Sequence, residues 1–173
     1  MRSDTDPNLN GVLIASKLPL EKRCHYAPNL EQPYRLLQST IKGVIVVGVY
    51  MPLDPAKTTY WDAIIAKAPE IATVPTLMIG DFNTGRHYMD EKGATFTSAK
   101  YMDHMEDVGF TDVWRKAHSE EREFSWYSNR GNGFRLDHAF ASTSLVSQIT
   151  SVYYSHQARE QGFSDHSIMV VEC

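Results

Sequence analysis

Cysteine is nearly absent from this sequence of 173 residues, in which Cys24 and the terminal Cys173 are the two examples. Two cysteines supply neither a disulfide framework nor a thiolate cluster for zinc or iron–sulfur chemistry. Long apolar runs are also absent, since none approaches the roughly 20 residues that a membrane-spanning helix requires. Residues 1–7 are polar and lack the apolar region of a secretory signal. We therefore expect a cytoplasmic protein that has no membrane partner.

An excess of positive charge is lacking too. The 17 Lys and Arg residues are outnumbered by 21 Asp and Glu residues, which gives a formal net charge of −4. Proteins that hold nucleic acid by bulk electrostatic attraction usually present a basic face. A metal enzyme, however, concentrates carboxylates in its cleft, and these can mask a local basic rim. The charge therefore argues only weakly against a nucleic-acid partner, and it leaves small phosphorylated substrates open.

Short apolar runs alternate with longer segments of helical periodicity, and no repeat, low-complexity tract or linker divides them. Residues 44–50 are apolar on both faces, as in a central strand of a covered sheet. Residues 58–72 and 98–108 have the spacing and end signals of helices. The other strand-like runs are residues 11–16, 34–41, 76–79, 124–127, 135–141, 149–154 and 167–172. The sequence therefore predicts a single mixed α/β (α+β) domain over residues 1–173.

The first cluster of polar residues follows the apolar run at residues 76–79. Asp81 and Asn83 lie two positions apart, so in an extended chain their side chains point to the same face. The carboxylate can take a proton from water, and the amide can donate to a phosphoryl oxygen. Because Gly, Asp and Asn are also turn formers, an Asx-turn explains this segment about as well.

Two further clusters occur later in the chain. Asp165 and His166 precede the last predicted strand, and because neighbouring side chains in a strand point apart, they would serve different ligands. Asp165 suits a metal, and His166 suits a phosphate or water; a capped turn is the simpler alternative. Asp137 enters a strand, where its carboxylate can fix the tautomer of a histidine. An ion pair with Arg135, two positions away, remains an alternative for Asp137.

Together, the motifs resemble the endonuclease/exonuclease/phosphatase (DNase I-like) superfamily, and in particular its exonuclease III branch. The resemblance covers the chain from roughly Asn10 to the C-terminus and includes the segment 11–20. The stretches that carry it are Gly-Val-Tyr-Met-Pro at 48–52, Gly-Asp-Phe-Asn at 80–83, Phe-Ser-Trp-Tyr at 124–127, Arg-Leu-Asp-His at 135–138 and Ser-Asp-His at 164–166. Each motif is modest, but their joint order and spacing are specific.

The resemblance implies a two-layer β-sandwich flanked by helices, with the active cleft formed by loops at one end. It also implies a role for each matching residue. His166 would contact the scissile phosphate, and Asp137 would orient its imidazole. Asp81 would position or deprotonate the attacking water. Asn83 and Tyr50 would bind the same phosphate.

Asp165 would help to hold a divalent metal, Mg²⁺ or Mn²⁺, because an oxygen-only site suits such ions. Members of the superfamily begin with a strand that carries an Asn and a second strand that ends in a Glu, their principal metal ligand. Neither segment is present here, and Glu21 and Glu31 do not match that position. We therefore expect an N-terminally truncated domain that misses its first strands. We also expect weak or absent metal-dependent activity of the isolated chain, with a homo-oligomer or a completing chain as the partner that would supply these strands.

The substrate is expected to be DNA. Arg130 and Arg135 flank Phe134 in a composition that suits gripping a nucleic-acid backbone and wedging against a sugar or base. Trp126 belongs to the same predicted substrate-binding set, although a β-hairpin turn explains residues 129–134 as well. The resemblance to the exonuclease III branch favours a DNA nuclease of base-excision repair. A phosphatase of a phospholipid, inositol phosphate or nucleotide and a non-catalytic binding or assembly module are the alternatives.

Overall fold

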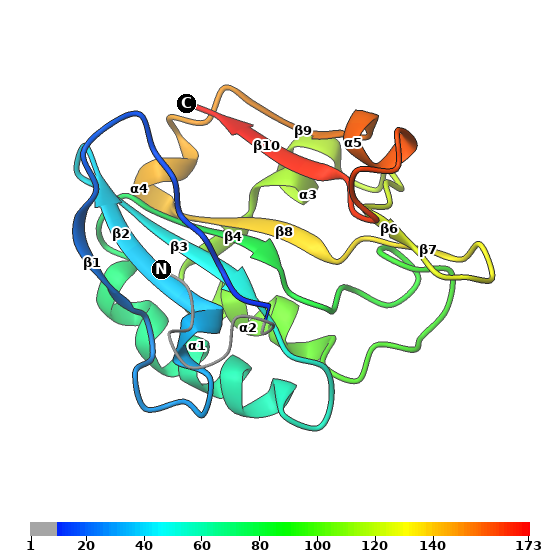
Figure 1. The fold of residues 1–173 in the computed structure, drawn as a ribbon, viewed down its shortest axis with the longest axis horizontal. Coiled ribbons are helices and arrows are strands. Elements are labelled where there is room, and N and C mark those ends of the chain that lie inside the picture. Colours follow the sequence, from blue (N-terminus) through cyan, green and yellow to red (C-terminus); the bar gives the residue numbers. More distant parts are fainter. Residues whose placement is uncertain (1–9) are drawn as a thin grey trace.

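A six-stranded mixed sheet forms the centre of the molecule. The structure is a computed structural model that describes residues 10–173, so the polar segment 1–7 lies outside the described residues. The strands of the sheet are β1 Glu21–His25, β2 Leu36–Ile41, β3 Val44–Tyr50, β4 Thr76–Asp81, β5 Phe110–Asp112 and β8 Asp137–Ser142. Their order is β1-β2-β3-β4-β8-β5 (Figure 1). Neighbouring strands are antiparallel except for β3 and β4, which are parallel.

Two short antiparallel strand pairs and several helices complete the described chain. The pairs are β6 Trp126–Tyr127 with β7 Gly133–Phe134 and β9 Ser151–Ser155 with β10 Ile168–Glu172. The helices are η1 Pro33–Arg35, a 3-10 turn, and α1 Lys57–Ile71, α2 Lys100–Asp107, α3 Val113–His118, α4 Thr143–Val146 and α5 Gln157–Glu160. None of the helices in residues 10–173 has the length and apolarity that a bilayer crossing needs.

The two faces of the central sheet bury different apolar clusters, because side chains alternate along each strand. On one face, Met78 and Phe140 pack in a cluster with Trp61 of α1 and with residues of α2. On the other face, Ala139 packs in a cluster with Tyr154 of β9 and with side chains of α3, α4 and β10. Helices α1 and α2 therefore cover one face of the sheet, and β9 and β10 lie over the other.

The expected two-layer sandwich is present in part. Within residues 10–173, the β9–β10 pair packs over β8 on the face opposite α1 and α2, and the extended segment 10–18 lies over β3 on the same face. The prediction of a strand at residues 11–16 is wrong, because this segment joins no β-ladder. It nevertheless lies close over β3: a Cβ at Gly48 would be 2.5 Å from Cγ1 of Val12. Gly48 therefore permits the chain to approach this face of the sheet.

Candidate active site

Strand register brings three of the predicted site residues into one row. Tyr50 at the end of β3 pairs with Asp81 at the end of β4, and Asp81 pairs with Asp137 at the start of β8. Paired residues of neighbouring strands lie on the same face, with about 5 Å between adjacent strands. The row therefore places a phenol and two carboxylates next to one another at one end of the sheet.

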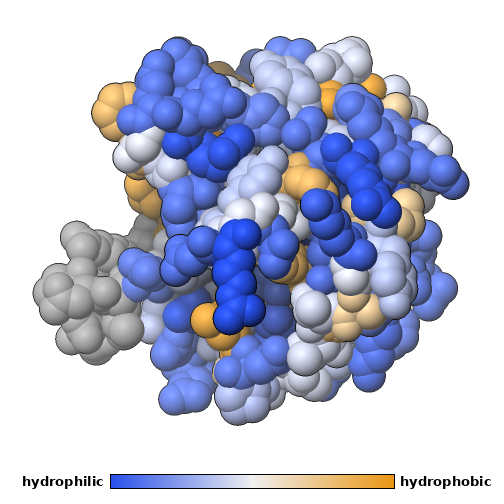
Figure 2. Space-filling model, turned by 90° about the vertical axis from the view of Figure 1, so that its right-hand side faces the viewer, coloured by the Kyte–Doolittle hydropathy of each residue, from blue (hydrophilic) through white to orange (hydrophobic). Residues whose placement is uncertain are grey.

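The three side chains of this row line a pocket of about 670 Å³. The pocket lies at the end of the sheet towards which β4 runs, and Figure 2 shows that end as mainly hydrophilic, with small apolar patches among the polar side chains. Eight of the ten predicted site residues line it: Tyr50, Asp81, Asn83, Trp126, Phe134, Asp137, Asp165 and His166. Asn10, Leu53, Phe96, Leu136 and Ser164 complete its wall. The structure thus brings together residues that lie far apart in the sequence.

His166 and Asp137 form a direct pair. Nδ1 of the imidazole lies 2.8 Å from Oδ2 of Asp137, so the carboxylate accepts a hydrogen bond from the Nδ1–H group. The other ring nitrogen, Nε2, is not used in this hydrogen bond. Burial alone would lower the pKa of His166. The hydrogen bond and negative charge of Asp137 outweigh that effect, with help from Asp81 and Asp165, and raise the pKa above its usual value. The paired carboxylate therefore favours the positively charged form of the imidazole.

The ionised form of Asp81 is disfavoured, because this carboxylate is poorly solvated and lies beside another carboxylate. Burial is the largest cause, followed by the charge of Asp137, and together they raise the pKa of Asp81 to about 7. The backbone N–H of Asn83 and the charges of His166 and Lys57 oppose the rise. Near pH 7, Asp81 is therefore protonated in some molecules and ionised in the others, and the ionised form can accept a proton as a general base.

Asn83 is oriented by a tight network. Its backbone φ is +48°, in the left-handed region, and its N–H donates to Oδ1 of Asp81 over 2.8 Å. The side-chain Nδ2 donates to the Met51 carbonyl over 2.7 Å and to Oδ2 of Asp81 over 3.1 Å. Both amide protons thus have acceptors within the protein. In this arrangement Asn83 orients Asp81, whereas the resemblance had implied a direct bond to phosphate.

Gly80 is required by the backbone immediately before Asp81. Its φ is +145°, and a Cβ there would lie 2.0 Å from the Val49 carbonyl oxygen. We expect Gly80→Ala to destabilise the protein by more than about 2 kcal/mol, because strand β4 must shift away from β3. Gly93→Ala is the matched control, since the nearest atom to its added Cβ is Oε2 of Glu91 at 4.0 Å. Urea unfolding of both variants measures the difference, and equal stabilities would contradict the strain.

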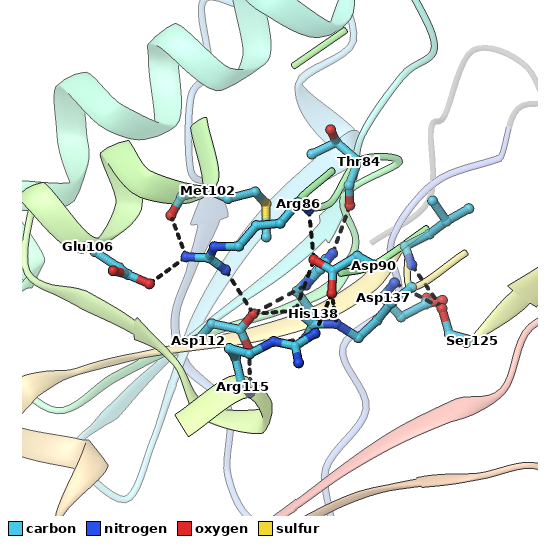
Figure 3. Close-up of polar contacts among 12 residues, drawn as sticks. Thr84, Arg86, Asp90, Met102, Glu106, Asp112, Arg115, Ser125, Asp137 and His138 are labelled. Atoms are coloured by element: carbon cyan, nitrogen blue, oxygen red, sulfur yellow. Dashed lines mark hydrogen bonds and ion pairs between the residues drawn. The ribbon is translucent and has the colours of Figure 1, made fainter. Parts of the chain in front are cut away.

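Arg135 was predicted to bind substrate, and this prediction is wrong because its side chain is fully buried. Its guanidinium donates through Nε to Oδ1 of Asp90 over 2.8 Å and through Nη2 to Oδ2 of Asp112 over 2.6 Å. Figure 3 shows these two aspartates facing each other across the network. The alternative of an Arg135–Asp137 ion pair fails for the same reason. Arg130 is exposed in the turn between β6 and β7, outside the pocket wall.

Ser125 is a positioning residue that sequence reasoning did not single out from its motif. It is fully buried, and its hydroxyl accepts the backbone N–H groups of Leu136 and Asp137 over 3.0 and 3.2 Å (Figure 3). Its carbonyl accepts the N–H of Ser167 over 2.7 Å. One serine therefore fixes the backbone beside both members of the His166–Asp137 pair.

An aromatic wall closes one side of the pocket. The rings of Trp126 and Phe134 lie 5.8 Å apart, and Phe96 meets Phe134 edge-on at 5.8 Å. Phe96 was not predicted, because it lies in a loop with no local periodicity. Its loop is held by the buried carboxylate of Glu91, which accepts the backbone N–H groups of Thr95 and Phe96 over 2.7 and 3.2 Å. A flat hydrophobic group of a substrate would fit against this wall.

A divalent metal ion is not accommodated by a complete ligand set in the described chain. Among residues 10–173, no three His, Cys, Asp or Glu side chains are placed to share one ion. Asp165, the predicted ligand, is exposed at the pocket wall, and its Oδ2 accepts the indole N–H of Trp126 over 3.3 Å. His166 meets Trp126 in an isolated β-bridge, while its imidazole pairs with Asp137, so the side chains of the neighbours Asp165 and His166 contact different residues. The residues present supply one carboxylate ligand rather than a metal site.

Comparison with known proteins agrees with the motifs. The model of the Endonuclease/Exonuclease/phosphatase family matches residues 3–166. No curated protein sequence matches the chain. Among solved structures, the 3′ phosphatase NExo from Neisseria bound to a product DNA hairpin superposes with a TM-score of 0.80 at 22% identity, covering 91% of this chain and 72% of that one.

Two further solved structures are similar. The 3′-5′ exonuclease NExo from Neisseria meningitidis has a TM-score of 0.80 at 23% identity, with coverage of 91% of this chain and 72% of that chain. An AP endonuclease from Archaeoglobus fulgidus has a TM-score of 0.76 at 22% identity, with coverage of 90% and 71%. At these identities the similarity establishes the fold.

Proposed function

This chain belongs to the Endonuclease/Exonuclease/phosphatase family, and we propose that it hydrolyses phosphodiester bonds in DNA as a repair nuclease of the exonuclease III kind. The observation that carries the proposal is the convergence of the His166–Asp137 pair and Asp81 on one pocket. Hydrolysis of a phosphodiester needs a group that takes a proton from water and groups that stabilise charge on the phosphoryl oxygens. The pocket holds both.

Asp81 is the group that would accept the proton of the attacking water. A general base works best when its pKa lies near the working pH, and the pKa of Asp81 is raised to about 7. The two hydrogen bonds from Asn83 fix the carboxylate in one orientation. Water bound at this carboxylate would therefore approach the phosphorus from a defined direction.

His166 and Tyr50 would bind the phosphate opposite this water. The imidazolium of His166, stabilised by Asp137, would donate from Nε2 to a non-bridging or leaving oxygen, where negative charge develops. Tyr50 stands in the same row, and the guanidinium of Arg35 lies 4.6 Å from the centre of its ring. The Tyr50 hydroxyl would supply a second donor to the same phosphate.

Enzymes of this family are typically metal-dependent. We propose Asp165 as one carboxylate ligand of Mg²⁺ or Mn²⁺, which would stabilise charge on the phosphate when bound.

Two observations support DNA as the substrate. The wall formed by Trp126, Phe134 and Phe96 suits stacking or wedging against a sugar or base. One structural neighbour, the NExo phosphatase, was solved with a DNA hairpin. A phosphatase of a phospholipid, inositol phosphate or nucleotide is the second candidate, and the net charge of −4 favours it because small substrates need no basic face.

The test is cleavage of a substrate panel in the presence of Mg²⁺ and, separately, Mn²⁺. The panel contains an abasic duplex, a blunt duplex, a duplex with a 3′-terminal phosphate and inositol phosphates. Selective cleavage of DNA is expected, whereas selective turnover of inositol phosphates would replace the nuclease by the phosphatase. Binding of DNA without cleavage of any substrate would favour a non-catalytic binding module.

His166→Gln is expected to lower DNA cleavage by about 100-fold, because glutamine cannot carry the positive charge or transfer a proton. His104→Gln, on helix α2 and outside the pocket wall, is the matched control and is expected to keep full activity. Single-turnover cleavage rates at pH 7 compare the two variants. A loss smaller than threefold in His166→Gln would remove the imidazole from the mechanism.

A further inference from the structure

Lys57 is buried beneath residues 81–83, the segment that carries Asp81 and Asn83, although lysine is rarely buried unless it is paired. It is the first residue of α1, and the residue is 5% exposed. Its Nζ donates to the Asn83 carbonyl over 2.7 Å and lies 3.8 Å from Oδ2 of Asp54. Burial lowers the pKa of Lys57, while the charges of Asp54 and Asp81 oppose that effect. An ammonium group is thus held below the turn that carries Asp81.

The Asn83 carbonyl is the place where this ammonium acts on the turn. Two other groups of Asn83 are already fixed, since its N–H donates to Asp81 and its side-chain Nδ2 donates to Asp81 and Met51. The left-handed φ of Asn83 is uncommon for a residue with a side chain and persists when neighbouring groups fix it. Lys57 completes the set of fixed contacts by binding the carbonyl, and so sets the direction of the peptide group.

We propose that Lys57 is a positioning residue for Asp81, acting through the Asn83 carbonyl and through its own positive charge. Lys57 is absent from the pocket wall, so it would not contact the substrate. Loss of the ammonium would loosen the turn and remove a charge that favours the ionised carboxylate. The inference rests on the proposed function for its kinetic consequence, whereas its effect on Asp81 itself is measurable in the free protein.

The charged groups around Asp81 define what the test must separate. Asp137 on β8 raises its pKa, while His166 before β10 and Lys57 on α1 lower it. Replacing Lys57 changes one of these while the His166–Asp137 pair stays intact. A shift in the Asp81 titration in such a variant therefore reports on the lysine and not on the histidine pair.

The experiment compares Lys57→Met, Lys57→Arg and Lys67→Met. Lys67 is a matched control, because it lies on the same helix and its Nζ donates to another backbone carbonyl, that of Tyr26, over 2.6 Å. The carboxyl ¹³C signal of Asp81 is titrated by NMR in each protein, and cleavage of the abasic duplex is measured across pH. Unfolding in urea records the stability of each variant.

In Lys57→Met, we expect the Asp81 titration midpoint to rise by about one pH unit and kcat to fall by roughly 10-fold at pH 7, with KM changed less than twofold. Lys57→Arg should restore the midpoint because it keeps the charge. An unchanged midpoint in Lys57→Met, or an equal rise in Lys67→Met, would overturn the proposal even if stability falls. If the wild-type chain cleaves nothing, the proposed function fails, and the titration still decides the role of Lys57.

Discussion

Replacing Asp81 by Asn is expected to lower DNA cleavage by about 1,000-fold and, at pH 8, to make the protein more stable. The catalytic loss follows because an amide cannot accept a proton from water, and a positioned general base contributes roughly 10²–10⁴-fold. The gain in stability follows from the environment of the carboxylate, which is buried beside Asp137. The same substitution would therefore lower the rate of cleavage and raise the stability of the folded chain.

The sign of the stability change follows from the pKa of Asp81. This pKa rises from an ordinary 3.8 to about 7 in the folded state, so the folded chain binds a proton in a range where the unfolded chain has released it. Stability therefore falls as the pH rises from about 4 to about 7 and stays at the lower level above that range. A difference of this size corresponds to at most about 4 kcal/mol. Loss of one bond from Asn83 costs about 1 kcal/mol, so we expect a net gain of about 2 kcal/mol at pH 8.

Urea unfolding of wild type and Asp81→Asn between pH 4 and pH 8 measures this effect. The advantage of the variant should shrink steadily as the pH falls towards 4, because Asp81 is then protonated in the folded state and its buried charge is removed. Asp107→Asn, on the exposed end of α2, is the control and should show no such pH dependence. An Asp81→Asn protein that is less stable than wild type at pH 8 would show that the carboxylate is not strained in this pocket.

Arg135→Met is expected to destabilise the protein by about 3–5 kcal/mol, a large share of the stability of a domain of this size. The change leaves the carboxylates of Asp90 and Asp112 buried with their main cationic partner removed (Figure 3). Burial tends to raise the pKa of both acids, and the charge of Arg135 overcomes this and keeps their pKa values low. Nη2 of Arg115 remains 2.6 Å from Oδ1 of Asp90, so the loss would fall mainly on Asp112, which would have to bind a proton or admit water.

Lysine should not rescue this position. Arg135 uses Nε, Nη1 and Nη2 to bridge Asp90 and Asp112, and a single ammonium cannot reproduce that planar fork. Arg135→Lys should therefore remain at least about 2 kcal/mol less stable than wild type. Arg130→Met tests the same chemical change at an exposed turn and should alter stability by less than about 0.5 kcal/mol. Similar losses at both arginines would contradict the assignment.

The sequence pattern predicted the buried strands and helices well, because a buried element shows a run or a periodic spacing of apolar residues in the sequence. Strand β3 has the predicted bounds, residues 44–50, and α1 at Lys57–Ile71 begins and ends one residue from the predicted helix at 58–72. Short or exposed elements were missed, since β1 is almost wholly exposed and its sequence shows no apolar alternation. Strand β5 is too short for periodicity to be visible.

The motifs allowed sequence reasoning to predict which distant residues would meet, while the chemical roles of these residues stay predictions. Asp81, Asp137 and His166 do meet in one pocket, as their order along the chain had indicated. Arg135 was assigned wrongly because its partners Asp90 and Asp112 lie 45 and 23 positions away. A short sequence motif cannot predict contacts between residues that lie so far apart in the chain. The spacing of Arg135 and Asp137 had suggested an ion pair on one face of a strand. Strand β8 begins at Asp137, however, so Arg135 lies before the regular strand.

Because Tyr50, Asp81 and Asp137 align across β3, β4 and β8, the proposed hydrolysis would depend on correct pairing of these strands. A shift of β8 by a single residue would put Leu136 or His138 opposite Asp81 and turn the Asp137 carboxylate towards the helices. A compact chain with slipped strands could bury most of its apolar side chains and still be inert. Recovery of turnover during refolding should therefore lag behind recovery of secondary structure, and it marks the moment when the strands reach their native pairing.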